Sequence, residues 1–591
     1  MNRRRFLGTA AAAPLAAGSR AFSSPSSSSV ESTPPLVSPQ ADVPIHQRYE
    51  LTLRRVLHGN SPAYTEEFLL ADVRPVAGRR FTEFSGDLSG RYIGALATAA
   101  RVYRTSFPAL DCLVPKVIAL QKSDGYFGST FHYDKPTDGD LALLWGNGRL
   151  LVGLLEYCRY KPDPAVLAAS KRLGDFLLRV APLMLSRKIR DEFGAAHFAS
   201  SYICWTQQTE GLAGLYLATH DERYRSLTEA IAAVIERRPG DHAHGYLTSL
   251  RGVMDLFQTT SDVRLLQQCE AAWQDIVHSE DLLDTGGVPE GWSPNKHRSE
   301  GCAEVDWLRF NLSLWKATAN PKYLAAAERA TFNELALNQF ANGDFGHRVL
   351  TETGISGDGA VRAWWCCTLH GLRYFPDLQA SAFRADKGAL CYELPIDSDI
   401  DNRHAPAASL DAVATSSLAQ NRAAKITIIS AGAAPASLLI RKPEWANALD
   451  ILVNGTAGQH PLEGDYVRLH RQWRRGDAVT VTYAMTLQSK PGAQKRMTFS
   501  YGPWLLGAPE LGNPAYFNEL TTDNRLAAAK DQTAAVHPNR PFRVPVAART
   551  FPFTPAEFPD QQGTVTQRAV AEQTGEPTTA WQLRFLTEGA G

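Results

Sequence analysis

Hydrophobic and polar positions follow two different rhythms along this chain, and the change falls near residue 380. Between about residues 90 and 375, apolar residues recur at helical spacing in pairs of segments that are separated by a short polar turn. Five pairs can be recognised, with turns near Pro108, Asp163, Asp221, Asp262 and Asn320. The pattern therefore predicts helical hairpins in series.

Two arrangements of these hairpins are open, a solenoid or a closed toroid. The repeats are long and unequal, and the loops between them are rich in Gly, Trp, His and acidic residues. Such loops gather at one end of a closed toroid. With the segment from Cys366 to Pro376 supplying part of a further pair, we expect an (α/α)6 barrel whose central cleft holds the ligand.

After about residue 380, short segments such as AKITIIS, LDILVNG and DAVTVTYAM alternate apolar and polar residues, which is typical of strands. Asn454-Gly455 is a hairpin signal. The chain is thus expected to be mainly α with an all-β C-terminal part. We predict an (α/α)6 barrel over 43–380, with a short N-terminal β segment, and one or more β-sandwich domains over 381–591. The sandwich is more simply read as structural support than as a sugar-binding module.

The first residues resemble an export signal of the twin-arginine type. MNRRRFLGTAAAAPLAAGSRAF has a basic head, a weakly apolar run and small residues at its end, which defines a signal over 1–22. The run is shorter than the roughly 20 residues that span a bilayer, so a membrane anchor is disfavoured. The Ser/Pro-rich stretch 23–42 is expected to be a disordered linker. We expect a bacterial protein, periplasmic or secreted, whose mature chain does not insert into a membrane.

The charge balance limits the kinds of binding partner that are expected. The 61 basic and 61 acidic side chains cancel, and no long block of like charge follows residue 5. Neither nucleic acid nor an anionic membrane surface is indicated, and a neutral partner fits better. The oligomeric state stays open, a homodimer included.

Eight cysteines occur at irregular spacing in a chain too large to need disulfides. Four lie in apolar helical segments and are predicted to be buried packing residues: Cys112, Cys158, Cys204 and Cys269. The others of interest are Cys302, in Glu300-Gly301-Cys302, and the adjacent pair Cys366 and Cys367. One carboxylate and three thiolates would complete four-coordinate zinc if their loops converge, and buried or oxidisable thiols are the alternative.

Several motifs together resemble glycoside hydrolase family 127 and related β-L-arabinofuranosidase-like proteins. They are TGGVPEG, SEGCAE, NPKYLAAAERATFNELA and WWCC, followed by LLIRKPEW, ILVNG and YGPWLLG. The resemblance spans roughly residues 65 to 507. It implies a zinc ion held by Glu300, Cys302, Cys366 and Cys367, with Cys366 as nucleophile. It also implies a sugar contact for Glu328 and an acid/base role for Glu290.

The chemistry behind this assignment is coherent. Metal coordination keeps a thiol deprotonated, so that the thiolate can attack an anomeric carbon. A retaining reaction also needs a general acid/base, and Pro289 and Trp292 beside Glu290 would limit its solvation. A solvated loop glutamate is the alternative interpretation of Glu290, and Glu304, one helical turn from Glu300, is the second candidate acid/base.

Departures from the family pattern concern the sugar pocket. Arg149 stands where a histidine is expected, YICWTQQTEG offers Gln207 and Gln208, and His244 is displaced by a few residues but is still a candidate sugar contact. Arg149, Lys296 and Arg298 would favour an acidic sugar, unless they are surface or structural cations. Aromatic residues that either stack on sugar or pack in the core are Trp145, Trp205, Trp292 and Trp365.

The sequence thus predicts an exo-acting, retaining glycoside hydrolase that uses zinc and acts on L-arabinofuranose-like or related sugars, acidic ones included. Its substrate would be an oligosaccharide or a fragment of a polysaccharide. Two alternatives remain: a non-catalytic carbohydrate-binding barrel, and a lyase or unsaturated uronyl hydrolase on the same scaffold, which would need no metal thiolate.

Overall fold

The computed structural model describes residues 44–59, 63–75, 83–187, 201–340, 342–356, 362–398, 408–491, 496–509 and 580–584, together with short strands beyond residue 509. The predicted export signal and linker, 1–42, lie outside the described residues. Among the described helices, none combines the length and the apolar character needed to cross a membrane.

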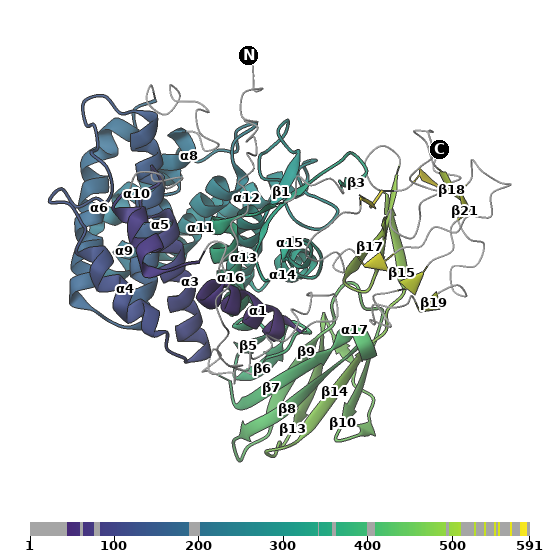
Figure 1. The fold of residues 1–591 in the computed structure, drawn as a ribbon. Coiled ribbons are helices and arrows are strands. Elements are labelled where there is room, and N and C mark those ends of the chain that lie inside the picture. Colours follow the sequence, from purple (N-terminus) through teal and green to yellow (C-terminus); the bar gives the residue numbers. More distant parts are fainter. Residues whose placement is uncertain are drawn as a thin grey trace, which may run out of the picture. The chain divides into compact units, whose positions relative to one another are not determined.

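Six helices form a closed inner ring, in which each contacts the next and the last contacts the first (Figure 1). They are α3 (Asp87–Tyr103), α5 (Asp138–Tyr160), α9 (Thr209–Thr219), α11 (Ala243–Thr260), α13 (Gly301–Thr318) and α16 (Trp365–Gln379). Their outer partners are α4 (Pro108–Ile118), α6 (Pro164–Met184), α10 (Glu222–Ala232), α12 (Val263–Val277), α14 (Pro321–Arg329) and α1 (Ile45–His58). The predicted (α/α)6 barrel is confirmed, and its sixth pair joins α16 to α1 from the start of the described chain.

The polar turns between paired helices work as helix caps. The side chains of Asp163, Asp221, Asp262 and Asn320 accept hydrogen bonds from the first backbone amides of α6, α10, α12 and α14. Each such cap contributes roughly 1 kcal/mol, because it satisfies an amide that has no partner within the helix. The repeated turns seen in the sequence are therefore the devices that start each outer helix.

Glycines allow α3 and α5 to approach closely. A Cβ on Gly90 of α3 would lie 2.5 Å from the backbone of α5, and one on Gly153 would lie 2.2 Å from the carbonyl oxygen of Gly90. A larger residue at either position would push the helices apart. The close approach places Asp87 of α3 beside Trp145 of α5.

A three-stranded sheet at one end of the ring positions the cysteine-bearing helices. It has the order β1-β2-β4, with β1 (Arg298–Glu300), β2 (Gly346–Val349) and β4 (Arg362–Ala363). β1 runs directly into α13, and β4 leads through Trp364 into α16. The short β segment expected at the N-terminal start of the barrel is not found among the described residues, because α1 is the first described element there.

The strands that follow the barrel form two five-stranded sheets, with the orders β11-β10-β14-β8-β7 and β12-β13-β9-β6-β5. Asn454 and Gly455, with φ of 51° and 78°, make the predicted turn between β10 and β11. The strands are β5 (Phe383–Asp386), β6 (Ala389–Tyr392), β7 (Leu410–Ser417), β8 (Ala423–Ala431), β9 (Ala436–Arg441), β10 (Leu449–Val453), β11 (Thr456–Ala457), β12 (Leu462–Glu463), β13 (Tyr466–Arg471) and β14 (Ala478–Tyr483).

A further sheet has the order β15-β16-β17-β23-β3, with β22 paired to β17. Its strands are β15 (Leu487–Pro491), β16 (Met497–Tyr501), β17 (Trp504–Pro509), β22 (Arg568–Ala569), β23 (Trp581–Gln582) and β3 (Gly354–Ile355). Short helices are α2 (Glu66–Val73), α8 (Ser201–Thr206), α15 (Ala336–Asn338), α17 (Leu418–Asn421) and the π-helix η1 (Ala330–Leu335). Short strands complete the described chain: β18 (Arg525–Ala527), β19 (His537–Pro538), β20 (Arg549–Thr550), β21 (Thr554–Pro555) and β24 (Leu586–Thr587).

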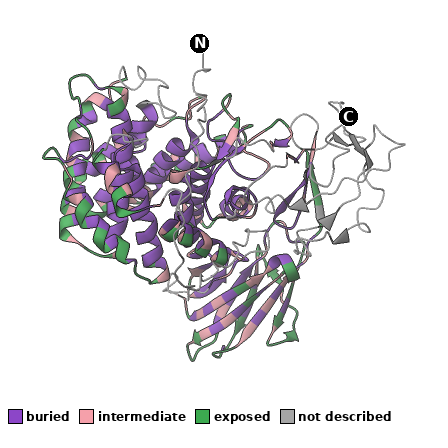
Figure 2. Ribbon diagram, viewed as in Figure 1, coloured by how far each residue is buried: buried purple, intermediate pink, exposed green. Residues whose placement is uncertain are grey.

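The inner ring is buried over most of its length, whereas exposed positions gather on the outer helices and the sheet edges (Figure 2). The cysteines follow this division only in part. Cys204 and Cys269 are buried and Cys158 is half-buried, but Cys112 is exposed on the outer helix α4, so its predicted packing role is wrong. All eight cysteines are free thiols.

Candidate active site

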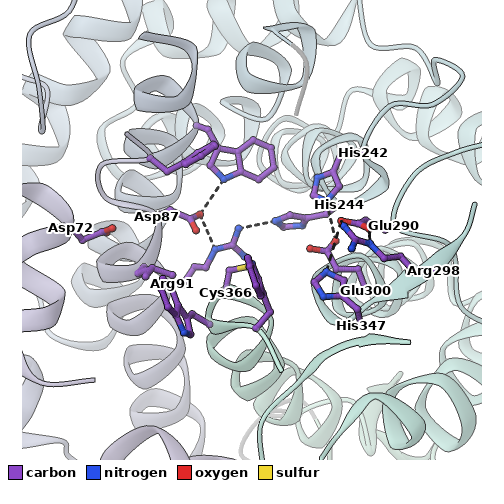
Figure 3. A pocket seen from close by; sticks show the side chains of 15 residues that line it. Asp72, Asp87, Arg91, His242, His244, Glu290, Arg298, Glu300, His347 and Cys366 are labelled. Carbon is purple, nitrogen blue, oxygen red and sulfur yellow. Dashed lines mark hydrogen bonds and ion pairs between the residues drawn. The ribbon is translucent and has the colours of Figure 1, made fainter. Parts of the chain in front are cut away.

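A cavity of about 370 Å³ lies at the end of the ring where β1 and β2 meet the helices. Its walls come from α2, α3, α5, α11, β1, β2 and α16, and from the loops that join them. Figure 3 shows many of its charged side chains facing one another. The lining residues are Asp72, Phe84, Asp87, Leu88, Arg91, Trp145, His242, His244, Glu290, Arg298, Glu300, His347, Trp364, Trp365 and Cys366.

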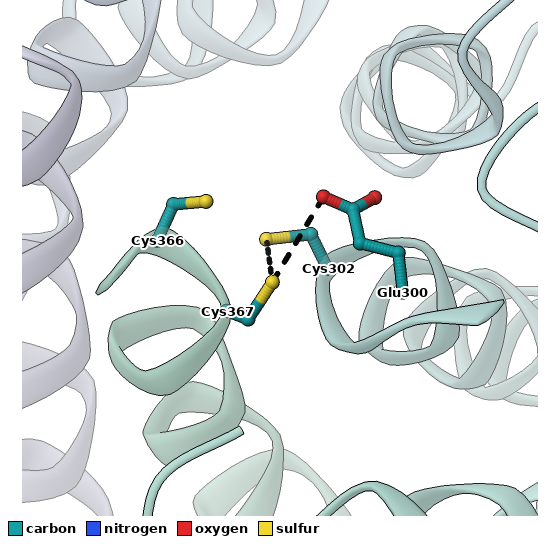
Figure 4. Close-up of side chains that lie close together, drawn as sticks. All are labelled: Glu300, Cys302, Cys366 and Cys367. Atoms are coloured by element: carbon teal, nitrogen blue, oxygen red, sulfur yellow. Dashed lines mark hydrogen bonds between the residues drawn. The ribbon is translucent and has the colours of Figure 1, made fainter. Parts of the chain in front are cut away.

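Three thiols and one carboxylate converge beside this cavity (Figure 4). The Sγ atoms of Cys302 and Cys367 are 3.7 Å apart, and Sγ of Cys367 is 3.9 Å from Oε1 of Glu300. With Cys366, all four donor atoms lie within 4.8 Å of one another. Cys302 and Cys367 are buried, and Cys366 is the cysteine that lines the cavity.

This geometry fits a tetrahedral metal ion. Zinc–sulfur bonds of about 2.3 Å place two sulfur ligands about 3.8 Å apart in a tetrahedron, close to the separation of Cys302 and Cys367. Thiolates are ligands that zinc prefers. Among the described residues, Arg91 donates to this sulfur pair, with its Nη1 3.6 Å from Sγ of Cys302. The residues present therefore suit zinc.

Cys366 differs from its two neighbours in acidity. Hydrogen bonds from the thiols of Cys302 and Cys367, aided by the charge of Arg91, hold the pKa of Cys366 well below its usual range. Burial raises the pKa of both Cys302 and Cys367. The sulfur with the strongest thiolate character is thus the one that faces the cavity, and a thiolate is the nucleophilic form of cysteine.

The Glu300 carboxylate is held by a histidine. Nε2 of His242 lies 3.0 Å from Oε2 of Glu300. Burial would raise the pKa of Glu300, but His242 first, and then His244 and His347, hold it below the ordinary range. Burial likewise would lower the pKa of His242, and the Glu300 charge raises it. Glu300 is therefore a carboxylate, the form that ligates metal.

Glu290 lies in the same cavity, on a loop fixed from two sides. Pro289 pairs with Ser299 and Gly291 with His242 through isolated β-bridges. The Glu290 carboxylate receives both Nε and Nη2 of Arg298, the latter at 2.8 Å. Nε2 of His347 is 3.8 Å from Oε1 of Glu290.

The opposite wall is a hydrogen-bonded chain that starts on α3. Nε of Arg91 donates to Oδ1 of Asp87 at 2.8 Å, and Nη2 donates to Nε2 of His244 at 2.9 Å. Nδ1 of His244 lies 2.5 Å from Oδ2 of Asp306. Because Nε2 of His244 accepts a hydrogen bond, its ring is neutral and carries its proton on Nδ1. Burial lowers the pKa of His244, which agrees with a neutral ring.

Two of the predicted glutamates lie away from the cavity. Glu304 is fully buried, where its carboxylate accepts from the Val288 amide; burial and the neighbouring Glu334 raise its pKa. Glu328 is buried against the β-domain, and its Oε2 is 2.5 Å from Nη2 of Arg441 on β9. Neither residue reaches the space beside Cys366, because each carboxylate faces its own buried pocket.

The aromatic and basic residues that were predicted to contact sugar also divide into those that line the cavity and those that lie away from it. His244, Trp145, Trp365 and Arg298 line the cavity. Trp292 is buried with its ring against Tyr246, and Trp205 is wholly buried. Arg149 is an interior cation that binds Gln207 and Glu210, Gln208 is an interior residue, and Lys296 pairs with Glu280 near the surface.

Five titratable lining residues were not predicted: Asp72, Asp87, Arg91, His242 and His347. Asp87 and Arg91 are four residues apart in an otherwise apolar helix, which is a signal that the sequence does carry. His242 stands two residues before His244 in the same HAHGY segment. His347 lies on β2 within DFGHRVL, where nothing in the local pattern distinguishes it.

Comparison with protein-family models decides the family. The model of the β-L-arabinofuranosidase GH127 catalytic domain matches residues 51–380, and that of the GH127 middle domain matches residues 392–485. This chain belongs to glycoside hydrolase family 127. It is accordingly a glycoside hydrolase whose substrate is a carbohydrate. A search of curated protein sequences found no match.

Solved structures share the fold of this GH127 member. A GH127 β-arabinofuranosidase is 16% identical with a TM-score of 0.68, and the match covers 94% of this chain and 98% of that one. A GH127 β-L-arabinofuranosidase from Geobacillus stearothermophilus T6 is 15% identical with a TM-score of 0.63, over 92% and 99%. A third structure, described as a glycoside hydrolase, is 17% identical with a TM-score of 0.62, over 86% and 94%.

Proposed function

We propose that this GH127 enzyme is a retaining, exo-acting glycosidase for L-arabinofuranose-like sugars, with Cys366 as nucleophile and Glu290 as general acid/base. The observation that carries the proposal is the position of Cys366, whose sulfur lies with Cys302, Cys367 and Glu300 at the wall of a cavity of about 370 Å³. A cavity near the lower end of the range for small-molecule sites suits one sugar unit. Two of the structural relatives are described as β-arabinofuranosidases, which supports the choice of sugar.

Glu300, Cys302, Cys366 and Cys367 would hold a zinc ion, which would supply positive charge that keeps the thiol deprotonated. In the first half of the reaction, the Cys366 thiolate attacks the anomeric carbon. The bond from that carbon to the leaving oxygen breaks, and protonated Glu290 gives its proton to the leaving oxygen. A thioglycosyl intermediate on Cys366 results.

In the second half, the Glu290 carboxylate takes a proton from water, and the water oxygen attacks the anomeric carbon. The carbon–sulfur bond breaks and the Cys366 thiolate is restored. Two displacements give net retention of configuration. The bidentate contact with Arg298 is made by the carboxylate form of Glu290, so it belongs to this half of the cycle. When Glu290 carries its proton, one Arg298 contact is given up.

A release assay tests the proposal. Aryl β-L-arabinofuranosides, with aryl uronides as the contrasting set, are incubated with enzyme that is supplied with zinc and kept reduced. We expect turnover of the arabinofuranosides and a thioglycosyl adduct on Cys366 in rapidly quenched samples, detected by mass spectrometry of peptides. Turnover by Cys366→Ser at the wild-type rate would contradict the mechanism, and no turnover of any glycoside would favour a non-catalytic binding barrel.

Export remains a separate part of the proposal, supported by the twin-arginine-like sequence over 1–22. A fusion of residues 1–42 to a reporter that matures only after export by the twin-arginine route is the direct assay. Replacing Arg3 and Arg4 with Lys should block export of that reporter. Equal export of both fusions would contradict it.

A further inference from the structure

Asp87 presents one carboxylate oxygen to the cavity and keeps the other for the protein. Its Oδ1 accepts from Nε of Arg91 at 2.8 Å and from Nε1 of Trp145 at 3.1 Å, and both contacts are visible in Figure 3. Among the described residues, no donor to Oδ2 is present. The side chain retains 13% exposure and lines the cavity. A carboxylate oxygen placed in this way is an acceptor that awaits a donor from the ligand.

Asp87 is also held rigidly. Arg91, its main partner, is fixed in turn by His244, and His244 is fixed by Asp306. The carboxylate therefore cannot swing away without breaking a chain of buried hydrogen bonds. Preorganised acceptors of this kind select a ligand by its hydroxyl groups, because a missing donor leaves the acceptor desolvated without a partner.

The charges around the cavity point to the class of ligand. Apart from the candidate zinc ligands, the lining has three carboxylates, namely Asp72, Asp87 and Glu290. Its two arginines are already engaged, Arg91 by Asp87 and Arg298 by Glu290. A carboxylated sugar would add a further negative charge with no free cation among these residues to receive it.

We propose that Asp87 determines specificity: its Oδ2 accepts a hydrogen bond from a hydroxyl of a neutral sugar, and its charge disfavours carboxylated sugars. This inference rests on the proposed function, since it assumes that the sugar occupies the cavity beside Cys366. It also replaces the expectation of an acidic substrate, because Arg149 and Lys296 lie outside the cavity and Arg298 is paired.

The test measures binding rather than turnover. Methyl β-L-arabinofuranoside, each of its monodeoxy analogues and the corresponding uronate are titrated calorimetrically into zinc-loaded Cys366→Ser protein. The same ligands are titrated into Cys366→Ser with Asp87→Ala or with Asp87→Asn. Melting curves and zinc content verify that each protein is folded and loaded, and Asp87→Asn preserves the shape of the site if Asp87→Ala does not fold.

We expect one monodeoxy analogue to bind Cys366→Ser roughly 10- to 100-fold more weakly than the parent glycoside, as for a lost hydrogen bond to a charged group. That penalty should disappear when Asp87 is Ala, which is the pattern of a direct contact in a double-mutant cycle. The uronate should bind the Asp87→Asn protein better, relative to the neutral glycoside, than it binds protein that retains Asp87.

Two outcomes overturn the inference. If the same analogue is penalised equally with and without Asp87, the residue is only a structural partner of Arg91. If the uronate binds most tightly while Asp87 is present, the assignment of substrate class is wrong. Glycoside turnover by the wild type, measured alongside, separates this result from a failure of the proposed function. Absence of both turnover and binding overturns the two together.

Discussion

Two buried polar clusters lie inside one ring of helices and are built largely from the same two elements. α13 supplies Cys302 to one cluster and, one turn later, Asp306 to the other. α16 likewise supplies Cys366 and Cys367 to the first and His370 to the second. The first cluster consists of groups that can all act as anionic metal ligands, namely three thiols and the Glu300 carboxylate. The second cluster combines one carboxylate acceptor, Asp306, with the donors Arg251, Thr248, His244 and His370.

In the second cluster, every charge has an opposite partner. Asp306 accepts from Nη1 of Arg251 at 2.7 Å, from Thr248 at 2.6 Å and from Nε2 of His370 at 2.9 Å. The donor atoms of His244, Asp306 and His370 also lie within 4.8 Å of one another, which by itself satisfies the distance test for a metal site. Arg251 already supplies the positive charge there.

Both groups of donor atoms meet the same distance criterion, so proximity alone does not distinguish them, and the balance of charge is what differs. A buried carboxylate with arginine and histidine donors is electrostatically complete. Three buried thiolates and the Glu300 carboxylate would carry more negative charge than Arg91 and His242 balance, so the metal-binding form of this cluster needs a further cation. The proposed catalysis and metal binding therefore belong to the first cluster, and we expect the second cluster to stabilise the barrel.

The largest expected effect is on turnover. Cys366→Ser removes the proposed nucleophile, so kcat should fall by at least about 10⁴-fold, as for other enzymes that lose a covalent nucleophile. Asp306→Asn, in the second cluster, should keep the nucleophile and retain measurable turnover in the fraction of protein that is folded. Initial rates on an aryl arabinofuranoside measure both. Equal losses of kcat in the two variants would contradict the proposed difference between the clusters.

The second effect is on stability, and here Asp306→Asn should have a larger effect than Cys366→Ser. Asp306→Asn removes the charge of a buried carboxylate that pairs with Arg251 and leaves Arg251 with Glu210 as its remaining buried counter-charge, which should lower the free energy of unfolding by about 3 kcal/mol. Urea unfolding of the metal-free proteins measures it. Cys366→Ser in the same assay should change the free energy of unfolding by less than about 1 kcal/mol, because the buried cation nearest to it, Arg91, keeps its ion pair with Asp87. A smaller loss for Asp306→Asn than for Cys366→Ser would contradict the account.

The pH dependence of stability should separate the clusters further. Burial would raise the pKa of Asp306, but His370, His244 and Arg251 hold it well below the usual carboxyl range. The unfolded chain therefore takes up this proton first as the pH falls, so the stabilisation is complete above about pH 5 and declines progressively as the pH falls through the unfolded-state pKa of about 3.9 toward the lower pKa of the folded state. Metal-free Asp306→Asn should lose stability less steeply over that range than the metal-free wild type does. Parallel curves would show that Asp306 is not the group that titrates.

The smallest effect is expected at an exposed pair that serves as the control for both clusters. Nζ of Lys116 lies 2.6 Å from Oε1 of Glu66, and both side chains are about half exposed. Solvent screens such a pair, so Glu66→Gln should change the free energy of unfolding by no more than about 1 kcal/mol and leave turnover unchanged. A loss as large as that of Asp306→Asn would mean that burial is not what distinguishes the interior network.

The sequence predicted the barrel well because its helical hairpins repeat, and each polar turn at Asp163, Asp221, Asp262 and Asn320 marks a cap. It also predicted that Cys302 and Cys366 converge, since both follow loops at the same end of the ring. Burial of single side chains was less predictable. Glu328 and Glu304 stand on helices whose pattern does not reveal that their carboxylates face interior partners.

The opposite wall of the cavity escaped prediction for a related reason. Asp87 and Arg91 appear as an ordinary helical ion pair four residues apart, and only the closed ring shows that they line the same cavity as Cys366. His242 and His347 come from different elements, and their nearness to Glu300 and Glu290 depends on tertiary packing. Local spacing carries no information about such contacts.

The metal content of matched variants tests the central claim most directly. Wild type, Cys302→Ser and Asp306→Asn are purified without chelator, and zinc per folded chain is measured by elemental analysis. The account predicts about one zinc per chain in the wild type and in Asp306→Asn, and a loss of most of it, together with activity, in Cys302→Ser. Full activity of wild-type protein that contains no zinc, or undiminished zinc in Cys302→Ser, would contradict it.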